Sequence, residues 1–139
     1  MAGSINDQDV IRRVLTDKPR VAVVGLSSKP ERASNEVAAY LDERGFEIVP
    51  VNPMETEILG KTSYPDLASI PGEVEVVDVF RKAAEVGPIV DAAIAKGAKV
   101  LWLQLGVINE EAAQRAAEAG LDVVMDHCMK KELRALEGA

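Results

Sequence analysis

The chain has 139 residues, a formal net charge of −7 and 47% hydrophobic residues, as expected for one domain with one core. The acidic balance argues against a general nucleic-acid surface, and no apolar run approaches the ~20 residues that span a bilayer. No secretory signal is visible, and Cys128 is the single cysteine, so we expect a cytoplasmic protein without an internal disulfide.

Hydrophobic periodicity in the first part of the chain predicts two helices that alternate with two strands. The predicted elements are a helix at 6–17, a strand at 21–26, a helix at 34–44 and a strand at 46–51. The leading helix is amphipathic, with Asn6 or Asp7 as its cap, and we expect it to lie against the sheet. Pro50 lies inside the second strand and indicates a strand end or an edge position, because proline cannot donate to a ladder hydrogen bond.

An irregular region at 54–72 separates this half from three further strands, and we expect short turns of structure inside it. The remaining predicted elements are a strand at 74–80, a helix from about 83 or 88 to 96, a strand at 99–105, a helix at 110–119, a strand at 122–125 and a helix at 128–136. Trp102 lies within a strand and is expected to pack in the core.

Strands that are continuously apolar and alternate with helices predict a parallel sheet that is covered on both faces. We therefore expect an α/β fold, a Rossmann-like three-layer sandwich with a doubly wound parallel sheet of about five strands. The expected strand order is 3-2-1-4-5, counting the predicted strands along the chain. No linker or repeat divides the sequence, so residues 1–139 are expected to form a single domain.

Ligands of such sheets bind beyond the carboxyl ends of the strands, so the first strand exit is the leading candidate for a site. Its glycine lets the chain turn, its hydroxyls can bind phosphate, its two cations add charge, and its last serine can cap the next helix. These residues are Gly25, Ser27, Ser28, Lys29, Arg32 and Ser34. The pattern favours a diphosphate cradle for a nucleotide-like ligand, and the alternative is a surface loop with a helix cap.

Three common phosphate or phospho-transfer patterns are missing from this exit. Ser27 and Pro30 stand where the nicotinamide-cofactor fingerprint has its second and third glycines, and the second strand ends in Asn52 and Pro53 instead of an acidic residue. The Walker sequence is absent. A phospho-accepting receiver domain needs acidic residues directly after the first strand, where this chain has Leu26, Ser27 and Ser28, so we expect Asp78 to fix a turn or pair with a cation.

Six blocks in order along the chain resemble one family. They are Val-Gly-Leu-Ser-Ser-Lys-Pro-Glu-Arg, Pro-Val-Asn-Pro, Gly-Lys-Thr-Ser-Tyr-Pro-Asp-Leu, Val-Asp-Val-Phe-Arg, Trp-Leu-Gln-Leu-Gly-Val and Val-Val-Met-Asp-His-Cys. Over about residues 6–135 the chain is similar to the small stand-alone CoA-binding proteins, which resemble the N-terminal CoA-binding domain of the succinyl-CoA synthetase α subunit. The synthetase's phosphorylated histidine belongs to a further domain, so we do not expect the ligase reaction here.

The resemblance implies a Rossmann-like fold that binds coenzyme A, and it implies which strand exits hold each part of the ligand. Residues of the first exit, Gly25, Ser27, Ser28, Lys29 and Arg32, would face the phosphates. The nucleotide part would be flanked by Asn52, Pro53, Phe80 and Arg81. The pantetheine arm would lie along Gln104, Leu105 and Gly106.

Cys128 has two interpretations. In the first, its thiol lies near the CoA thiol and exchanges with it, with His127 activating the thiol. In the second, which we favour, Cys128 is a small buried residue at the start of the last helix. Neighbouring residues point apart on a helix, so no Cys–His pair is implied, and no metal site is expected. Lys130 and Lys131 are expected to be solvated helix surface.

We therefore expect a protein that binds CoA or an acyl-CoA at the carboxyl end of a parallel sheet without catalysis, as a monomer or weak homodimer. Two alternatives stay open: a thiol-exchange or acyl-transfer enzyme that uses Cys128, and a binder of another dinucleotide such as NAD.

Overall fold

The structure is a computed structural model that describes residues 2–138. Its elements are α1 (Gln8–Asp17), β1 (Arg20–Val24), α2 (Ala33–Glu43), β2 (Glu47–Val51), β3 (Glu57–Ile58), β4 (Lys61–Thr62), β5 (Val76–Val79), the 3-10 helix η1 (Ala83–Glu85), α3 (Val86–Lys96), β6 (Val100–Leu103), α4 (Glu110–Glu118), β7 (Asp122–Met125) and α5 (Met129–Glu137). None of the helices described is long and apolar enough to cross a membrane.

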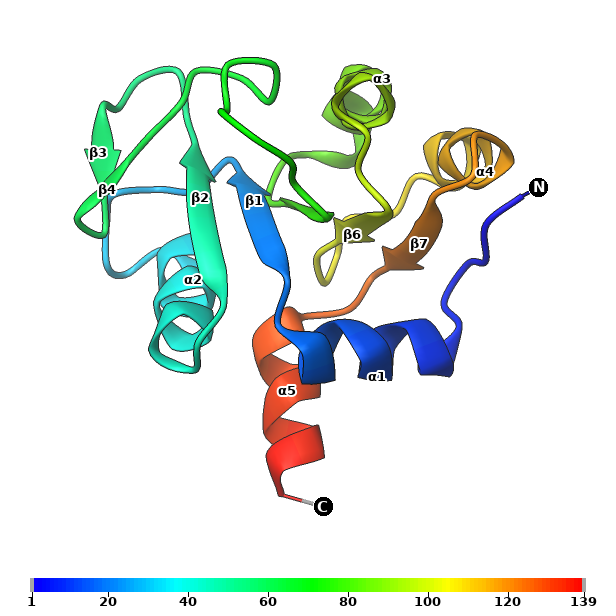
Figure 1. Cartoon of the computed structure of the whole chain (residues 1–139), viewed down its shortest axis with the longest axis horizontal. Coiled ribbons are helices and arrows are strands. Elements are labelled where there is room, and N and C mark those ends of the chain that lie inside the picture. Colours follow the sequence, from blue (N-terminus) through cyan, green and yellow to red (C-terminus); the bar gives the residue numbers. More distant parts are fainter. Residues whose placement is uncertain (1, 139) are drawn as a thin grey trace.

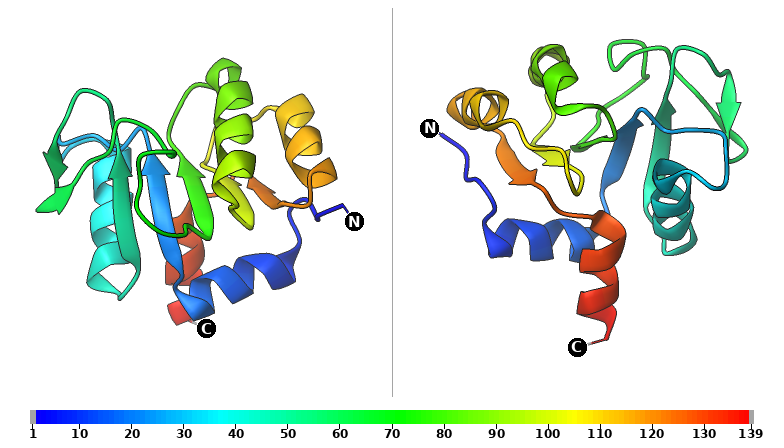
Figure 2. Two further views of the ribbon diagram at one scale, coloured as in Figure 1. Left: turned by 45° about the horizontal axis from the view of Figure 1, so that its top comes forward. Right: turned by 180° about the vertical axis from the view of Figure 1, so that it is seen from behind.

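A five-stranded parallel sheet lies between two layers of helices, which confirms the predicted Rossmann-like α/β sandwich (Figure 1). Figure 2 shows α3 and α4 on one face and α1, α2 and α5 on the other. Side chains of a strand alternate between the faces. In β1, Ala22 packs with α3 and α4, whereas Val21 and Val23 pack in the cluster of the opposite layer. Burial of both faces explains why the strands are continuously apolar.

The strand order differs from the prediction. The sheet runs β2-β1-β5-β6-β7, which is 2-1-3-4-5 in the order of the main strands along the chain, and the expected order 3-2-1-4-5 is wrong. The strand after the irregular region pairs with β1, with Val21 opposite Val76, and does not pair with β2. This arrangement leaves β2 at the edge of the sheet.

Pro50 supplies the physical reason for that edge position. Tyr64 donates its backbone N–H to the Pro50 carbonyl at 3.0 Å across the outer side of β2. The nitrogen and carbonyl of one strand residue point to the same side, so the nitrogen of Pro50, which carries no hydrogen, also faces outward. A neighbouring strand on that side would lack one ladder bond. The edge position that Pro50 indicated is therefore confirmed, and it is incompatible with the expected strand order.

The irregular region contains a small antiparallel hairpin of β3 and β4, in which Glu57 pairs with Thr62 and Ile58 with Lys61. Its two-residue loop has φ values of 56° at Leu59 and 72° at Gly60. Two positive φ values identify a type I′ turn, which suits the twist of a hairpin. The sequence indicated short structure here but not a hairpin, because leucine at the first turn position is not a typical signal.

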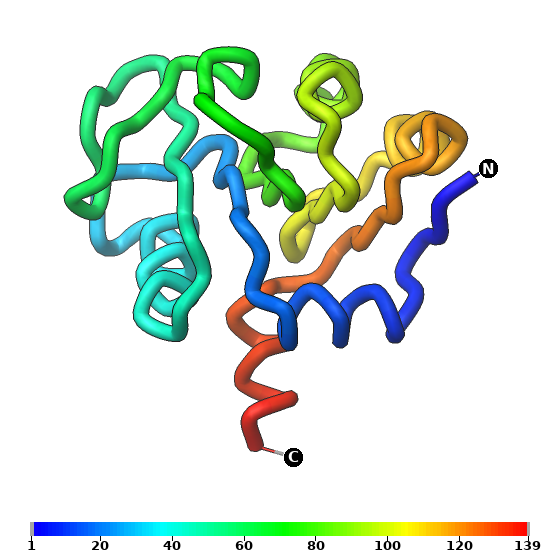
Figure 3. The backbone as a smooth tube through the Cα atoms, in the orientation of Figure 1, coloured from blue at the N-terminus to red at the C-terminus, as the bar shows by residue number. Residues whose placement is uncertain are grey.

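The N-terminal segment adds to the opposite edge of the sheet (Figure 3). Ile5 forms a parallel bridge to Val123 of β7, and Asp7 then caps α1 by accepting the Asp9 N–H at 2.8 Å. The predicted amphipathic face of α1 is confirmed, since its buried residues are Val10, Ile11, Val14 and Leu15. The bridge at Ile5 was not predicted, because the short segment before Asp7 carries no strand pattern.

Strands β1, β5 and β6 end earlier than their sequence patterns predicted. Paired backbone stops at Val24, Val79 and Leu103. The residues that follow leave the ladder at the same edge of the sheet, because the strands are parallel. These strand exits build the candidate site.

Candidate functional site

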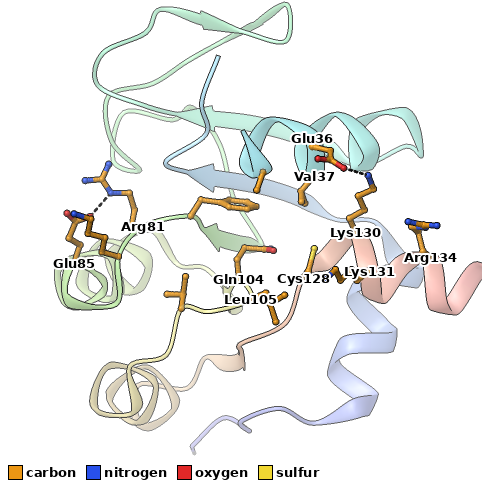
Figure 4. Close-up of a pocket in the computed structure, with 14 residues that line it drawn as sticks. Glu36, Val37, Arg81, Glu85, Gln104, Leu105, Cys128, Lys130, Lys131 and Arg134 are labelled. Atoms are coloured by element: carbon orange, nitrogen blue, oxygen red, sulfur yellow. Dashed lines mark hydrogen bonds and ion pairs between the residues drawn. The ribbon is translucent and has the colours of Figure 1, made fainter. Parts of the chain in front are cut away.

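Three adjoining cavities lie along the carboxyl edge of the sheet. The loop cavity, of about 350 Å³, is lined by the β1–α2 loop and includes Lys29 and Arg32. The β2 cavity, of about 450 Å³, includes Asn52 and Pro53. The α5 cavity, of about 880 Å³, includes Gln104 and residues of α5 (Figure 4).

The cavities meet at the exits of β1 and β5. Gly25 lines both the loop cavity and the β2 cavity, and Phe80 lines both the loop cavity and the α5 cavity. Arg81 lines the β2 and α5 cavities. Shared walls of this kind can hold one elongated ligand across all three spaces.

Gly25 allows the chain to turn where the cavities meet. Its φ is +84°, a value that side chains with a Cβ rarely adopt. A Cβ at this position would lie 2.4 Å from the carbonyl oxygen of Phe80. The turn after β1 therefore depends on glycine for its conformation and for the close approach of the β5 exit.

The β1–α2 loop is held against the first turn of α2. Ser27 donates its backbone N–H to the Ser34 hydroxyl at 3.0 Å, and the Asn35 side chain donates to the Ser27 carbonyl at 2.9 Å. The expectation that Ser34 caps the helix is wrong, since the N-cap is Arg32, which makes no side-chain cap hydrogen bond. Ser34 instead supports the loop, and the positive end of α2 faces the loop cavity without a side-chain cap.

Not every predicted residue reaches a cavity wall. Ser28 donates its hydroxyl to Glu55 at 2.9 Å, and Gly106 donates its N–H to Asp126 at 2.7 Å. Neither residue lines the three cavities. The others do, namely Gly25, Ser27, Lys29, Arg32, Ser34, Asn52, Pro53, Phe80, Arg81, Gln104 and Leu105. Their binding role stays a prediction.

Asn52 joins the exits of β1 and β2 and uses both ends of its amide. Its nitrogen donates to the Leu26 carbonyl at 2.9 Å, and its oxygen accepts the Met54 N–H at 2.8 Å. The β2 cavity around it has largely apolar walls, which include Leu67 and Ile89. This cavity therefore suits a weakly polar group.

Cys128 lies at the start of the last helix as predicted and packs against the core there, but it is not fully buried. It is half-buried, forms the N-cap of α5 and lines the α5 cavity. His127 lies beside it in sequence, but its Nδ1 is 3.6 Å from the Glu132 carboxylate. Trp102, by contrast, is fully buried as predicted, and its indole N–H donates to the His127 carbonyl at 2.9 Å.

The α5 cavity carries cations of α5 that the sequence pattern did not place in the site. Lys130, which we expected on the solvated surface, has a side chain only 21% exposed and lies 2.8 Å from Glu36 of α2. Hydrogen bonding to Lys130 lowers the pKa of Glu36. Arg81 pairs with Glu85 at 2.8 Å near the opposite end of the cavity (Figure 4). Only the packing of α5 beside α2 brings the lysine into the site.

Asp78 lies fully buried beneath Gln104, which donates its amide N–H to one carboxylate oxygen. The other oxygen, Oδ2, has no hydrogen-bond partner among the described residues. Burial raises the pKa of Asp78 from 3.8 to about 7, and the bonds from Gln104 and the Val79 N–H only partly oppose this effect. Asp78 neither fixes a turn nor pairs with a cation, so that expectation is wrong.

Known proteins share this arrangement of elements. Residues 19–134 match the sequence profile of a family described as CoA binding domain. Uncharacterized protein YneT of Bacillus subtilis (strain 168) is 39% identical over 120 residues, which cover 86% of this chain and 89% of YneT. The structure of a hypothetical protein from Pyrococcus horikoshii OT3 has a TM-score of 0.91 and 45% identity, and the match covers 95% of this chain and 93% of that one.

A shorter match involves one subunit of a ligase. It is 39% identical over 57 residues and covers 40% of this chain, but only 12% of the alpha subunit of acetate–CoA ligase [ADP-forming] II from Pyrococcus furiosus.

Replacing Gly25 should destabilise the fold through the contact with Phe80. Gly25→Ala combines an unfavourable positive φ with a 2.4 Å approach to a backbone oxygen. Gly60→Ala is the matched control, because Gly60 also has a positive φ, +72°, but nothing lies within 4 Å of its added Cβ. We expect Gly25→Ala to lower the free energy of unfolding by about 1–3 kcal/mol more than Gly60→Ala in urea denaturation. Equal losses would contradict this role of the contact.

Asp78 should make stability fall with rising pH. The folded protein keeps a proton on Asp78 up to a pKa of about 7, whereas the unfolded chain releases it near 3.8. The free energy of unfolding therefore decreases between these pH values, by up to about 4 kcal/mol, and the loss is complete above pH 7. Asp78→Asn should remove this dependence, which urea denaturation at pH 4 and pH 8 measures.

Asp66→Asn provides a control with the opposite sign. Hydrogen bonds from Ser69 lower the pKa of the exposed Asp66, so this carboxylate contributes stability at high pH that is lost on acidification. If the free energy of unfolding of Asp78→Asn changed with pH in the same way as that of the wild type, the prediction for Asp78 would be contradicted.

Proposed function

The chain belongs to the family of CoA-binding domains, and on that premise we propose that it binds coenzyme A or an acyl-CoA across the three cavities, without catalysis. The observation that carries the proposal is the continuity of the cavities along one sheet edge, with a helix N-terminus and two cations at one of them. Family and geometry together favour a ligand with a diphosphate and two long parts.

In this proposal the diphosphate lies in the loop cavity. The N-terminus of α2 supplies backbone N–H groups and a positive dipole end, and its first-turn residue Ser34 lines the cavity. Lys29 and Arg32 line the same space, and both are exposed, so they can move to meet phosphate oxygens. The glycine turn at Gly25 lets the ligand pass close to the backbone.

The two long parts of the ligand would extend in opposite directions. The apolar walls of the β2 cavity suit an adenine ring, with Pro53 and Leu67 on its walls. The α5 cavity suits the pantetheine arm, since Phe80 and Leu105 offer apolar surface and Gln104 offers an amide. In Figure 4 the amide oxygen of Gln104 points into this space, where it can accept an N–H of the arm.

NAD remains the rival among dinucleotides. An NAD site of this fold holds a ribose through an acidic residue at the end of the second strand. Here that position is Asn52, whose amide is already bonded to the backbone of Leu26 and Met54. Asp66 also lines the β2 cavity, but its Oδ1 accepts both the N–H and the hydroxyl of Ser69. These contacts favour CoA over NAD.

Calorimetric titration tests the proposal. CoA should bind the wild-type protein, and Lys29→Gln with Arg32→Gln should weaken binding at least about tenfold, because charge-assisted hydrogen bonds to phosphate are lost. Arg12→Gln with Lys99→Gln is the matched control: it removes the same charge at two exposed positions outside the cavities. Absence of heat with millimolar CoA, or displacement of CoA by equimolar NAD, would overturn the proposal.

The place of Cys128 favours a second candidate, a thiol exchange with CoA disulfide. Its half-buried thiol lines the α5 cavity, near the amide of Gln104 (Figure 4). The Cys128 thiolate would attack the disulfide, form a mixed disulfide between protein and CoA, and release the second CoA as a thiolate that takes a proton from solvent.

Intact-mass measurement after incubation with CoA disulfide tests this candidate. We expect the wild-type protein to gain the mass of one CoA, reversibly by dithiothreitol, and Cys128→Ser to gain none. An unchanged wild-type mass under conditions in which calorimetry detects CoA binding would eliminate the exchange but leave the binding proposal intact.

A further inference from the structure

The α5 cavity is strongly cationic, although the protein carries a net charge of −7. Seven charged residues line it, namely Glu36, Arg81, Lys82, Glu85, Lys130, Lys131 and Arg134. Five of them are cations and two are carboxylates, so the cavity opposes the sign of the whole molecule. Such a local field raises the concentration of anions at the cavity.

Both carboxylates of the cavity already have cationic partners. Glu85 pairs with Arg81 at 2.8 Å, and Glu36 pairs with Lys130 at 2.8 Å. Among the described residues no carboxylate pairs with Lys82, Lys131 or Arg134, although each of them lines the cavity. The positive charge of the cavity is therefore largely uncompensated.

The cations of α5 are placed at an electrostatic cost to the helix. Lys130 and Lys131 lie in its first turn, where the helix dipole is positive and cations are unfavourable. Arg134 is four residues after Lys130, a spacing at which like charges repel. Glu132, the carboxylate of the same turn, approaches His127 at 3.6 Å and does not line the cavity. An anion held by these cations would relieve both unfavourable terms.

We propose that the α5 wall, defined as Lys130, Lys131 and Arg134, binds an anionic group of the ligand that is separate from the diphosphate. The inference rests on the proposed binding of CoA. In Figure 4 the α5 wall lies at the end of the cavity remote from Arg81, with the apolar residues and Gln104 between them. The group it binds is the carboxylate at the end of a dicarboxylic acyl group, because the α5 cavity would hold the pantetheine arm that carries the acyl group, whereas the ribose phosphate would lie with the adenine ring at the β2 cavity.

Glu36 acts as an internal competitor for this anion. Its carboxylate holds Lys130 across the cavity wall while the side chain itself remains 61% exposed. A ligand anion must share or displace this contact to gain the full charge of the wall. Removing the carboxylate should therefore tighten binding of the anionic group, whereas removing wall cations should weaken it. These opposite signs separate a charge effect from a loss of folding.

Two matched ligand pairs identify the source of the anion in calorimetric titrations at low ionic strength. Glutaryl-CoA and valeryl-CoA differ by a terminal carboxylate, and CoA and dephospho-CoA differ by the ribose phosphate. We expect Lys131→Gln with Arg134→Gln to weaken the anionic member of the first pair, glutaryl-CoA, about tenfold and to leave valeryl-CoA within about twofold. Glu36→Gln should tighten the same anionic member by about threefold.

The outcomes are distinct. A change confined to the glutaryl and valeryl pair supports the carboxylate of the acyl group as the anion that the α5 wall binds, whereas a change confined to the CoA and dephospho-CoA pair would overturn this assignment. Binding of all four ligands with both ratios unaltered in the variants, or an equal effect from Arg12→Gln with Lys99→Gln, would overturn this inference alone. Failure of all four to bind the wild-type protein would overturn the proposed function and this inference with it.

Discussion

The approach of Gly25 to the carbonyl of Phe80 sets the geometry on which the site depends. Strand β1 pairs with β2 on one side and β5 on the other, so its chain must leave the sheet between two backbones. At 2.4 Å from the Phe80 oxygen there is no space for a Cβ. The β1 exit is therefore a bare turn, and the loop cavity and the β2 cavity meet there because no side chain fills it.

Electrostatics then divides this edge of the sheet into regions. The loop cavity has a helix N-terminus and exposed cations, the β2 cavity is largely apolar, and the α5 cavity has charged ends around an apolar middle. Because the protein as a whole is acidic, this distribution of charge attracts anions mainly to the carboxyl edge of the sheet. Carboxylates such as Glu36 and Glu85 hold the flexible cations within the cavity walls, at the cost of competing with a ligand.

One carboxyl group beside the site is buried in an energetically unfavourable environment. Asp78 is buried with a single side-chain partner, Gln104, whose other amide atom is directed to the α5 cavity (Figure 4). A carboxylate in this position accepts the amide N–H and so orients the amide oxygen outward. Burying Asp78 costs free energy. In return, its hydrogen bond with Gln104 determines which amide atom of Gln104 faces the cavity.

The sequence by itself determined the layers, the alternation of elements and the strand exits, because these follow from local periodicity and from residues such as Gly25 and Pro50. Pro50 also indicated that β2 lies at an edge, but the expected strand order did not take this into account. Only the tertiary structure decided that β5 pairs with β1, that Lys130 enters the α5 cavity, and that Ser28 bonds to Glu55 and does not line the loop cavity. The physical reason is that each of these depends on contacts between segments far apart in the chain, such as α2 and α5, and no local pattern records which segments meet.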